Sequence, residues 1–110
     1  RREAFNDHVL DAVQQLEGRW AAQLDAVEFA VEDVPPSDPA PWEDCAVPLA
    51  RLFPAVDDLP TRIVLYRRPI ETRVDDRSAL APIVHEIIVE QVAGMLGIEP
   101  AQVDPRLTDD

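Results

Sequence analysis

Residues 79–96 carry the strongest structural signal in the chain. Apolar side chains recur there at helical spacing and cover a broad part of the surface: Leu80, Ile83, Val84, Ile87, Ile88, Val92, Met95 and Leu96. A helix this apolar is stable only when most of it is covered, so we expect a mostly buried helix. Ser78 is the predicted N-cap, Pro82 falls in the first turn, and Gly97 closes the helix.

The preceding residues show two kinds of periodicity. Residues 5–16 repeat at helical spacing, which predicts an amphipathic helix ending near Gly18, followed by a short turn at 20–24. Residues 26–34 alternate apolar and acidic side chains, as in a half-buried strand. Residues 61–68 are apolar on both faces, which predicts a strand inside a sheet.

The segments between these elements indicate loops and an edge strand. Residues 35–48 contain five prolines and are predicted to form a loop. Residues 47–53 are predicted to form a short edge strand, and Asp57, Asp58 and Pro60 mark the next turn.

The order of these elements indicates one small α+β domain over residues 1–110. We expect the helices to lie over a small mixed or antiparallel sheet, packed by an N-terminal helix and a long buried C-terminal helix. Residues 105–110, which include Pro105 and two final aspartates, are expected to form a flexible tail.

The charge balance limits the possible partners. The chain carries 22 acidic and 10 basic residues, a net charge of -12. Such a chain repels phosphate backbones and anionic lipids, so we expect no nucleic acid and no membrane partner, and no apolar run reaches spanning length. An acidic partner of a basic protein remains a hypothesis. The lone Cys45 cannot form an internal disulfide and fits a reducing, cytoplasmic setting.

His85-Glu86 is the first candidate for chemistry on the long helix. In zinc peptidases, His-Glu is followed by a second His at i+4, and the Glu acts as general base for the zinc-bound water. Val89 occupies that i+4 position here. We therefore expect His85 to be partly buried or at the helix surface, and Glu86 to be solvated.

A polar stripe interrupts the apolar surface of the same helix. Glu86 and Glu90 are i, i+4 neighbours, and Gly94 and Gly97 continue the stripe. Two carboxylates facing a groove can serve acid–base chemistry, whereas two solvated carboxylates are commonplace. A Gly inside a helix costs about 1 kcal/mol relative to Ala, so Gly94 predicts a close backbone approach or a position with an earlier purpose.

Three segments resemble the minimal zincin-like metallopeptidases of bacteria, small single-domain proteins. They are VEDVPP (31–36), LPTRIVLYRRPIE (59–71) and the LGI (96–98) that ends the long helix. The resemblance extends from the first helix to about Asp104 and implies a zincin-like fold.

The resemblance also fixes where a zinc site would lie. The family motif is His-Glu-x-x-His-x-x-Gly-x-x-Asp, in which both His and the Asp bind zinc and the Glu is the general base. With Gly97-Ile98 as the anchor, Glu90, Gly94 and Pro100 occupy the ligand positions and Gln91 the general-base position. The resemblance therefore implies a degenerate site, with no catalytic residue, no metal and no cofactor expected.

Two functions follow as hypotheses. The first is a non-catalytic module that binds a protein or peptide, in a groove formed by Glu86, Glu90, Gln91 and Gly94, or that forms a homodimer. The alternative is an active zinc-dependent peptidase with a non-standard metal site. Its ligands would come from His85, Glu86 and Glu90, with Glu99 or Asp104.

Arginines gather around the expected central strand, at Arg62, Arg67, Arg68 and Arg73. They indicate either a small anion site or, as we prefer, pairing with acidic residues of the neighbouring strand (Glu28, Glu32 and Asp33). Trp20 and Trp42 are interpreted as packing anchors rather than as the lining of a binding groove.

Overall fold

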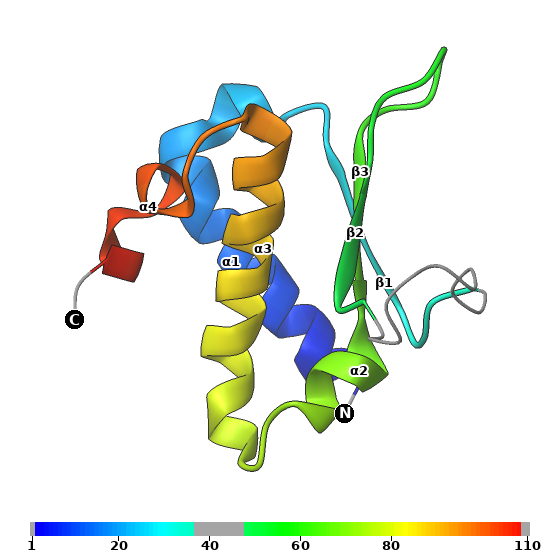
Figure 1. Ribbon diagram of the computed structural model, residues 1–110, viewed down its shortest axis with the longest axis vertical. Helices are drawn as coiled ribbons and strands as arrows, with labels where there is room; N and C mark the ends of the chain where they lie inside the picture. The colour runs from blue at the N-terminus through cyan, green and yellow to red at the C-terminus, as the bar shows by residue number, and fades with distance from the viewer. Residues whose placement is uncertain (1, 37–47, 109–110) are drawn as a thin grey trace, which may run out of the picture.

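The computed structural model describes residues 2–36 and 48–108. Most of the loop predicted at 35–48 therefore lies outside the described residues, as do Trp42 and Cys45. The described elements, in chain order, are α1 (Arg2–Leu24), β1 (Glu28–Glu32), β2 (Ala50–Phe53), β3 (Arg62–Tyr66), α2 (Arg67–Thr72), η1 (Arg77–Ala79), α3 (Leu80–Leu96), α4 (Pro100–Val103) and η2 (Pro105–Thr108). Figure 1 shows two layers, with α1 and α3 side by side on one side of the sheet.

The sheet is mixed and has the strand order β1-β3-β2. β1 runs parallel to β3, with Glu28 opposite Arg62, and β2 runs antiparallel to β3. This arrangement confirms the α+β prediction and places β2 at an edge, as expected. The central position of β3 explains its two apolar faces, because all four residues from Ile63 to Tyr66 are buried.

α3 packs against both α1 and the sheet. It contacts α1 along its length and β2 on its other side. Its buried residues, Leu80, Val84, Ile87, Ile88, Val89, Val92 and Ala93, join Phe5, Val9, Ala12 and Leu16 of α1 and Ile63 and Leu65 of β3 in one core. Gly97 ends the helix with φ 72°, in the left-handed conformation that glycine tolerates best. The predicted helix at 79–96 is thus confirmed.

Two boundaries near the helices differ from the predictions. α1 does not end at Gly18 but continues to Leu24, with a kink at Trp20 (φ −121°, ψ 28°). A single glycine weakens a helix without ending it when the turns on both sides are packed, as Leu16 and Leu24 are. Ser78 is not the N-cap: Asp76 accepts a hydrogen bond from the Ser78 backbone N–H and caps η1, which leads into α3.

The strand prediction at 61–68 is too long at its end. Arg67 and Arg68 begin α2, a short helix that also contains Pro69 near its start. Pro69 is therefore not the residue that stops the strand: β3 ends at Tyr66, and Pro69 falls in the first turn of α2, where its missing N–H has no helical partner. Ile70 of α2 is fully buried, which explains why this turn packs against α3.

The segment after Gly97 is folded, contrary to the expected loop. Pro100 begins α4, and a capping box precedes it. The Gln102 side chain accepts a hydrogen bond from the Glu99 backbone N–H, and the Glu99 side chain accepts one from the Gln102 backbone N–H. Val103 and Asp104 are buried. The tail expected at 105–110 begins with the η2 turn, whose Arg106 is held by Asp104, and residues 109–110 lie outside the described residues.

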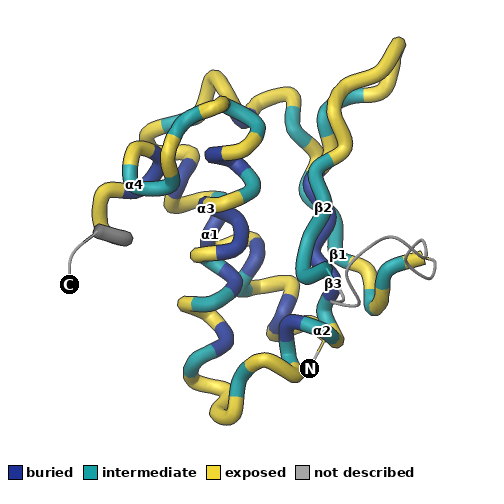
Figure 2. The backbone as a smooth tube through the Cα atoms, viewed as in Figure 1, coloured by how far each residue is buried: buried dark blue, intermediate teal, exposed yellow. Residues whose placement is uncertain are grey.

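A β-hairpin projects from the sheet between β2 and β3. We call residues 54–61 the arm; Figure 2 shows it extending away from the body, mostly exposed. Val56 and Leu59 bond to each other through both backbone N–H groups (3.1 and 2.8 Å), and Asp57 adopts φ 52° in the two-residue turn. The turn predicted at Asp57, Asp58 and Pro60 is therefore confirmed, as the tip of this arm.

One stretch departs from the expectation that no apolar segment reaches spanning length. Residues Arg77–Leu96 are long and apolar enough to cross a membrane by length and composition. Length and composition are weak evidence by themselves, since the core helix of a globular protein meets the same criterion. The packing of α3 against α1 and β2 accounts for its apolar character.

Candidate functional site

The exposed residues of α3 form one stripe. Glu86, Glu90, Gly94 and Gly97 are exposed and follow one another at intervals of three or four residues, while the flanking side chains are buried or half-buried. The stripe lies on the side of α3 away from the core. The described part of the chain thus presents the predicted Glu86–Gly94 stripe to solvent.

The two carboxylates of the stripe influence each other. The pKa of Glu90 is raised by partial burial of its carboxyl group and by the negative charge of Glu86, one turn earlier. The ionised form of the Glu90 carboxyl group is therefore disfavoured. Glu90 lies on an exposed turn of α3, and the neighbouring Gln91 is half-buried.

Gly94 has open space around it. No atom outside the local helix lies within 4 Å of the position that a Cβ would take. The close backbone approach predicted for Gly94 is therefore wrong, and the helical φ/ψ values there do not demand glycine. Of the two explanations predicted for Gly94, the one that remains is a position with an earlier purpose, because Gly94 has no packing role in the structure.

Pro100 serves as the first residue of α4. A proline suits this position because its missing N–H would have no helical partner there. Its ring offers no lone pair to a metal ion. The third position of the family motif therefore carries a helix-starting residue in this chain.

His85 lies on another side of α3 and makes a different contact. Its Nε2 is 2.6 Å from Oδ2 of Asp104, and the two groups join α3 to the end of α4. An ionised carboxylate only accepts, so Nε2 carries the proton. As predicted, His85 is partly buried and Glu86 is exposed. His85 and Glu90 are five residues apart, about 140° around the helix, so they do not converge.

Arg106 completes the polar contact around Asp104. Its backbone N–H and Nε each donate to Oδ1 at 3.1 Å, and Nη2 donates to Oδ2 at 3.2 Å. These bonds hold the pKa of Asp104 well below its usual range, assisted by His85 and opposed by the burial of Asp104, a residue that is 5% exposed. Arg106 also reaches Gln15 of α1, so the cluster ties three helices together.

The donor set does not fit a zinc ion. Zinc in proteins takes three or four His, Cys, Asp or Glu ligands. Glu90 is the one such side chain at the family positions, and the described residues contain no group of three or more that is placed to hold a metal. Among the described residues, the ligands suggested for a non-standard site do not come together: His85 contacts Asp104, whereas Glu86 and Glu90 face solvent.

Two of the four arginines near β3, Arg62 and Arg67, are engaged in ion pairs, as preferred from the sequence. Arg67 is 11% exposed and contacts Asp33 (3.1 Å) and Glu71 (2.9 Å), while Arg62 lies 3.9 Å from both Glu28 and Glu32. With Arg67 occupied on two sides, the structure favours pairing over an anion site at this residue. Trp20 is an anchor, since its Nε1 donates to the Val103 carbonyl at 2.8 Å.

One hollow of the described surface lies away from the α3 stripe. It is an open groove of about 540 Å³ between the first half of α1 and β1, lined by Asn6, Val9, Leu10, Phe29 and Val31 and bounded by Arg2, Glu32 and Asp33. No sequence pattern predicts this groove, because it joins segments far apart in the chain. The His85–Asp104–Arg106 contact was also missed as a unit, since nothing local marks Arg106.

Comparison with known proteins identifies one related family. A family model described as zincin-like metallopeptidase matches residues 24–108. The match covers all three strands, α3 and the α4–η2 segment. A search of curated proteins found no match.

Proposed function

The chain belongs to the zincin-like metallopeptidase family, and we propose that it uses this fold to bind a protein or peptide rather than to hydrolyse one with zinc. The observation that carries the proposal is the set of residues at the family positions. Glu90, Gly94 and Pro100 stand where the three ligands belong, and Gln91 stands where the general base belongs. A fold does not by itself confer the chemistry of its relatives.

The residues at the four family positions affect both functions of the site, metal binding and proton transfer. Gly94 and Pro100 have no side-chain donor, so a metal would keep a single carboxylate ligand at Glu90. The Gln91 amide cannot accept a proton from a bound water. The loss of the zinc ligands and of the general base supports the proposal that this chain does not catalyse zinc-dependent hydrolysis.

The binding surface that we propose lies between the α3 stripe and β2. β2 is an edge strand in contact with α3, so an extended peptide beside it would also meet Glu86, Glu90, Gln91 and Gly94. Leu49 accepts a bond from the Tyr66 N–H, so by alternation the backbone groups of Ala50 and Leu52 point outward. Outward N–H and C=O groups are the requirement for strand addition.

The alternative, an active peptidase with a non-standard site, is opposed by the geometry of the described residues. Nε2 of His85 is bonded to Oδ2 of Asp104, and both oxygens of Asp104 also accept hydrogen bonds from Arg106. Glu86 and Glu90 lie on a different side of α3. A metal would have to break the buried Asp104 contact to gather these ligands.

Restoring the motif tests the assignment of the site. The variant Glu90→His, Gln91→Glu, Gly94→His, Pro100→Asp should bind one zinc ion per chain in calorimetric titration, while the unmodified chain should bind none. A matched control with Gly94→Ala in place of Gly94→His should bind zinc much more weakly, because one imidazole is missing. Stoichiometric binding by the unmodified chain would overturn the proposal.

Selection from a library of unstructured peptides tests the binding role. Peptides that bind should lose affinity on Ala50→Pro, which removes an outward N–H at the first residue of β2, where proline is tolerated in strands. Arg51→Ala is the control, because the backbone of Arg51 faces β3. Peptides that bind equally well to both variants would place the binding surface elsewhere, and a selection without binders would refute a peptide-binding role.

A further inference from the structure

The outer edge of β2 presents outward-facing backbone groups at alternate residues. β2 pairs with β3 on one side only in the described sheet. Since the Tyr66 N–H donates to the Leu49 carbonyl, residues 49 and 51 bond toward β3, and Ala50 and Leu52 turn their N–H and C=O groups outward. The side chains of Ala50 and Leu52 pack against the core, on the face of the sheet that α3 covers. A strand added beside them therefore carries every second side chain on that same face.

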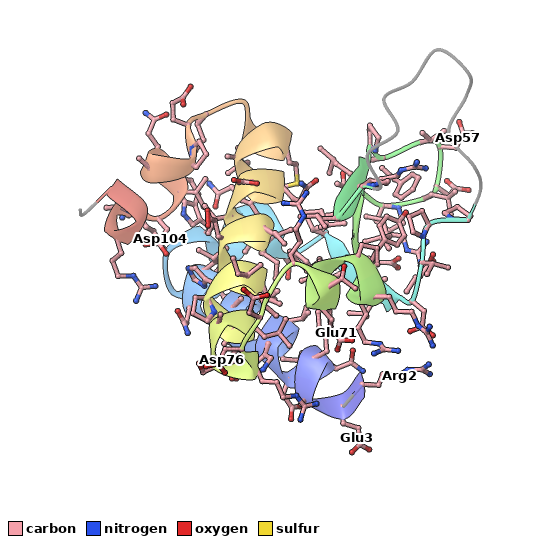
Figure 3. All side chains as sticks on the ribbon, turned by 60° about the horizontal axis from the view of Figure 1, so that its bottom comes forward. Arg2, Glu3, Asp57, Glu71, Asp76 and Asp104 are labelled. Atoms are coloured by element: carbon pink, nitrogen blue, oxygen red, sulfur yellow. The ribbon has the colours of Figure 1, made fainter. Side chains whose placement is uncertain are left out.

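The exposed stripe of α3 borders this edge. Glu86 and Glu90 lie on the same row of the helix, one turn apart, and the rows on either side of them face different neighbours. On one flank, His85 contacts Asp104 of the C-terminal segment. On the other flank, the buried Ile87 joins the core, and α3 contacts β2. Figure 3 shows Asp104 on one side of α3 and the sheet on the other, so the stripe lies between the C-terminal segment and β2.

The spacing of the two carboxylates matches the repeat of an extended chain. Glu86 and Glu90 are four residues apart on an α-helix, a rise of about 6 Å along the axis. Two residues of a β-strand rise by about 6.6 Å. Figure 1 shows α3 and β2 both running along the long dimension of the view, so a strand added to β2 would follow α3. Side chains at positions i and i+2 of that strand are therefore spaced to face one carboxylate each.

Glu86 and Glu90 have no basic partner within the described part of the chain. None of the ion pairs formed among residues 2–36 and 48–108 includes either carboxylate. Partial burial and the negative charge of Glu86 raise the pKa of Glu90, so a cation beside the pair would favour the ionised form of Glu90. Arg51 of β2 does not supply this cation, because its side chain alternates with those of Ala50 and Leu52 and lies on the opposite face of the sheet. A partner that lies along β2 can supply it.

From these observations we propose that the β2 edge takes an extended peptide that carries Lys or Arg at two alternate positions. The two basic residues lie beside Ala50 and Leu52 and face Glu86 and Glu90, while the residue between them points to the other face of the sheet. The net charge of -12 on the chain also attracts a basic peptide before contact. This inference rests on the proposed peptide-binding function and adds the charge and the spacing of the peptide.

Two synthetic peptides of identical composition test the spacing. Both are rich in threonine and valine and carry two lysines, separated by one residue in the first peptide and adjacent in the second. Fluorescence anisotropy at physiological salt should show that the first peptide binds about twofold to fivefold more tightly, the contribution of one exposed ion pair. The two peptides have the same net charge, so long-range attraction does not produce the difference. In the second peptide, adjacent side chains point to opposite faces, and one lysine alone meets the stripe.

Substitutions in the stripe locate the contact. Glu86→Gln with Glu90→Gln should weaken binding of the first peptide by about threefold to tenfold and leave the two peptides equal in affinity, because both ion pairs are lost. Glu3→Gln with Glu17→Gln is the matched control. It removes the same charge from exposed positions of α1, so the preference for the first peptide should remain.

A charge exchange completes the test. Glu86→Lys with Glu90→Lys should abolish the preference for alternate lysines and create a preference for alternate over adjacent glutamates in the same peptide. Binding that is lost on Ala50→Pro but depends neither on the lysine spacing nor on the stripe would overturn this inference and leave the proposed function intact. If neither peptide binds, this inference is overturned, and the library selection decides the proposed function. Thermal unfolding by circular dichroism checks that every variant is folded.

Discussion

Glu90, Gln91 and Gly94 show how single side chains separate fold from chemistry. Each sits on a regular turn of α3, and none of the three contributes a buried apolar contact. The core residues between them keep the helix in place whatever the exposed stripe contains. The stripe is thus free to vary without loss of the fold.

Gly94→Ala should stabilise the protein. Gly94 is exposed, helical and free of neighbours at the Cβ position, so alanine adds helix propensity of about 0.5–1 kcal/mol without a clash. Gly97→Ala is the matched control and should destabilise by about 1 kcal/mol, because Gly97 has φ 72°. Urea denaturation measures both. A loss of stability on Gly94→Ala would contradict the open environment described for this residue.

Asp104→Asn should destabilise the protein in a pH-dependent way. We expect a loss of about 1–3 kcal/mol at neutral pH, since a buried carboxylate loses charge-assisted bonds from Arg106 and His85. The low folded-state pKa of Asp104 means that its contribution is complete above the unfolded pKa of about 3.9 and is lost as pH falls toward the folded value.

The pH series supplies the control for this assignment. Urea denaturation from neutral pH to about pH 3 should show the difference between the original chain and Asp104→Asn shrinking on the acidic side. Glu99→Gln, an exposed carboxylate in the neighbouring turn, should show no comparable change. A difference that stays constant with pH would mean that Asp104 acts through packing rather than charge.

At the scale of elements, the C-terminal segment depends on contacts from distant helices. Val103 is buried, and its carbonyl accepts a hydrogen bond from Trp20 at the kink of α1. Arg106 bonds to Gln15 one turn earlier in α1. These contacts explain why a stretch that lacks helical periodicity in its sequence folds into α4 and η2.

Trp20→Phe should loosen this segment. The substitution keeps an aromatic ring but removes the indole N–H, leaving the Val103 carbonyl without this donor, at a cost of about 1 kcal/mol. Hydrogen exchange should increase first in residues 100–106. Equal exchange across the whole chain would instead indicate that Trp20 supports the core as a whole.

The elements that the sequence predicted correctly are those whose signal is local. β3 and α3 carry strong apolar patterns, and Gly97 marks a helix end by its conformation. The kink at Trp20 and the cap at Asp76 depend on packing and on competing hydrogen bonds, which periodicity does not report. For the site, sequence reasoning identified the positions on α3. It missed the Asp104–Arg106 contact and the α1–β1 groove, because both depend on tertiary structure.

At the scale of the whole molecule, the sheet and α3 reproduce the framework of a zinc peptidase around positions that do not supply zinc ligands. The family match over residues 24–108 includes the entire sheet and α3. The surfaces available for interaction are then the β2 edge beside the stripe, the arm and the α1–β1 groove.

Metal content is the measurement that tests the central claim most directly. The untagged chain, purified without chelator, offered excess zinc and dialysed, should contain almost no zinc by elemental mass spectrometry. That result is expected because Glu90 alone among Glu90, Gly94 and Pro100 offers a ligand atom. One tightly held zinc ion per chain would contradict the account and would show that other residues build a metal site in this fold.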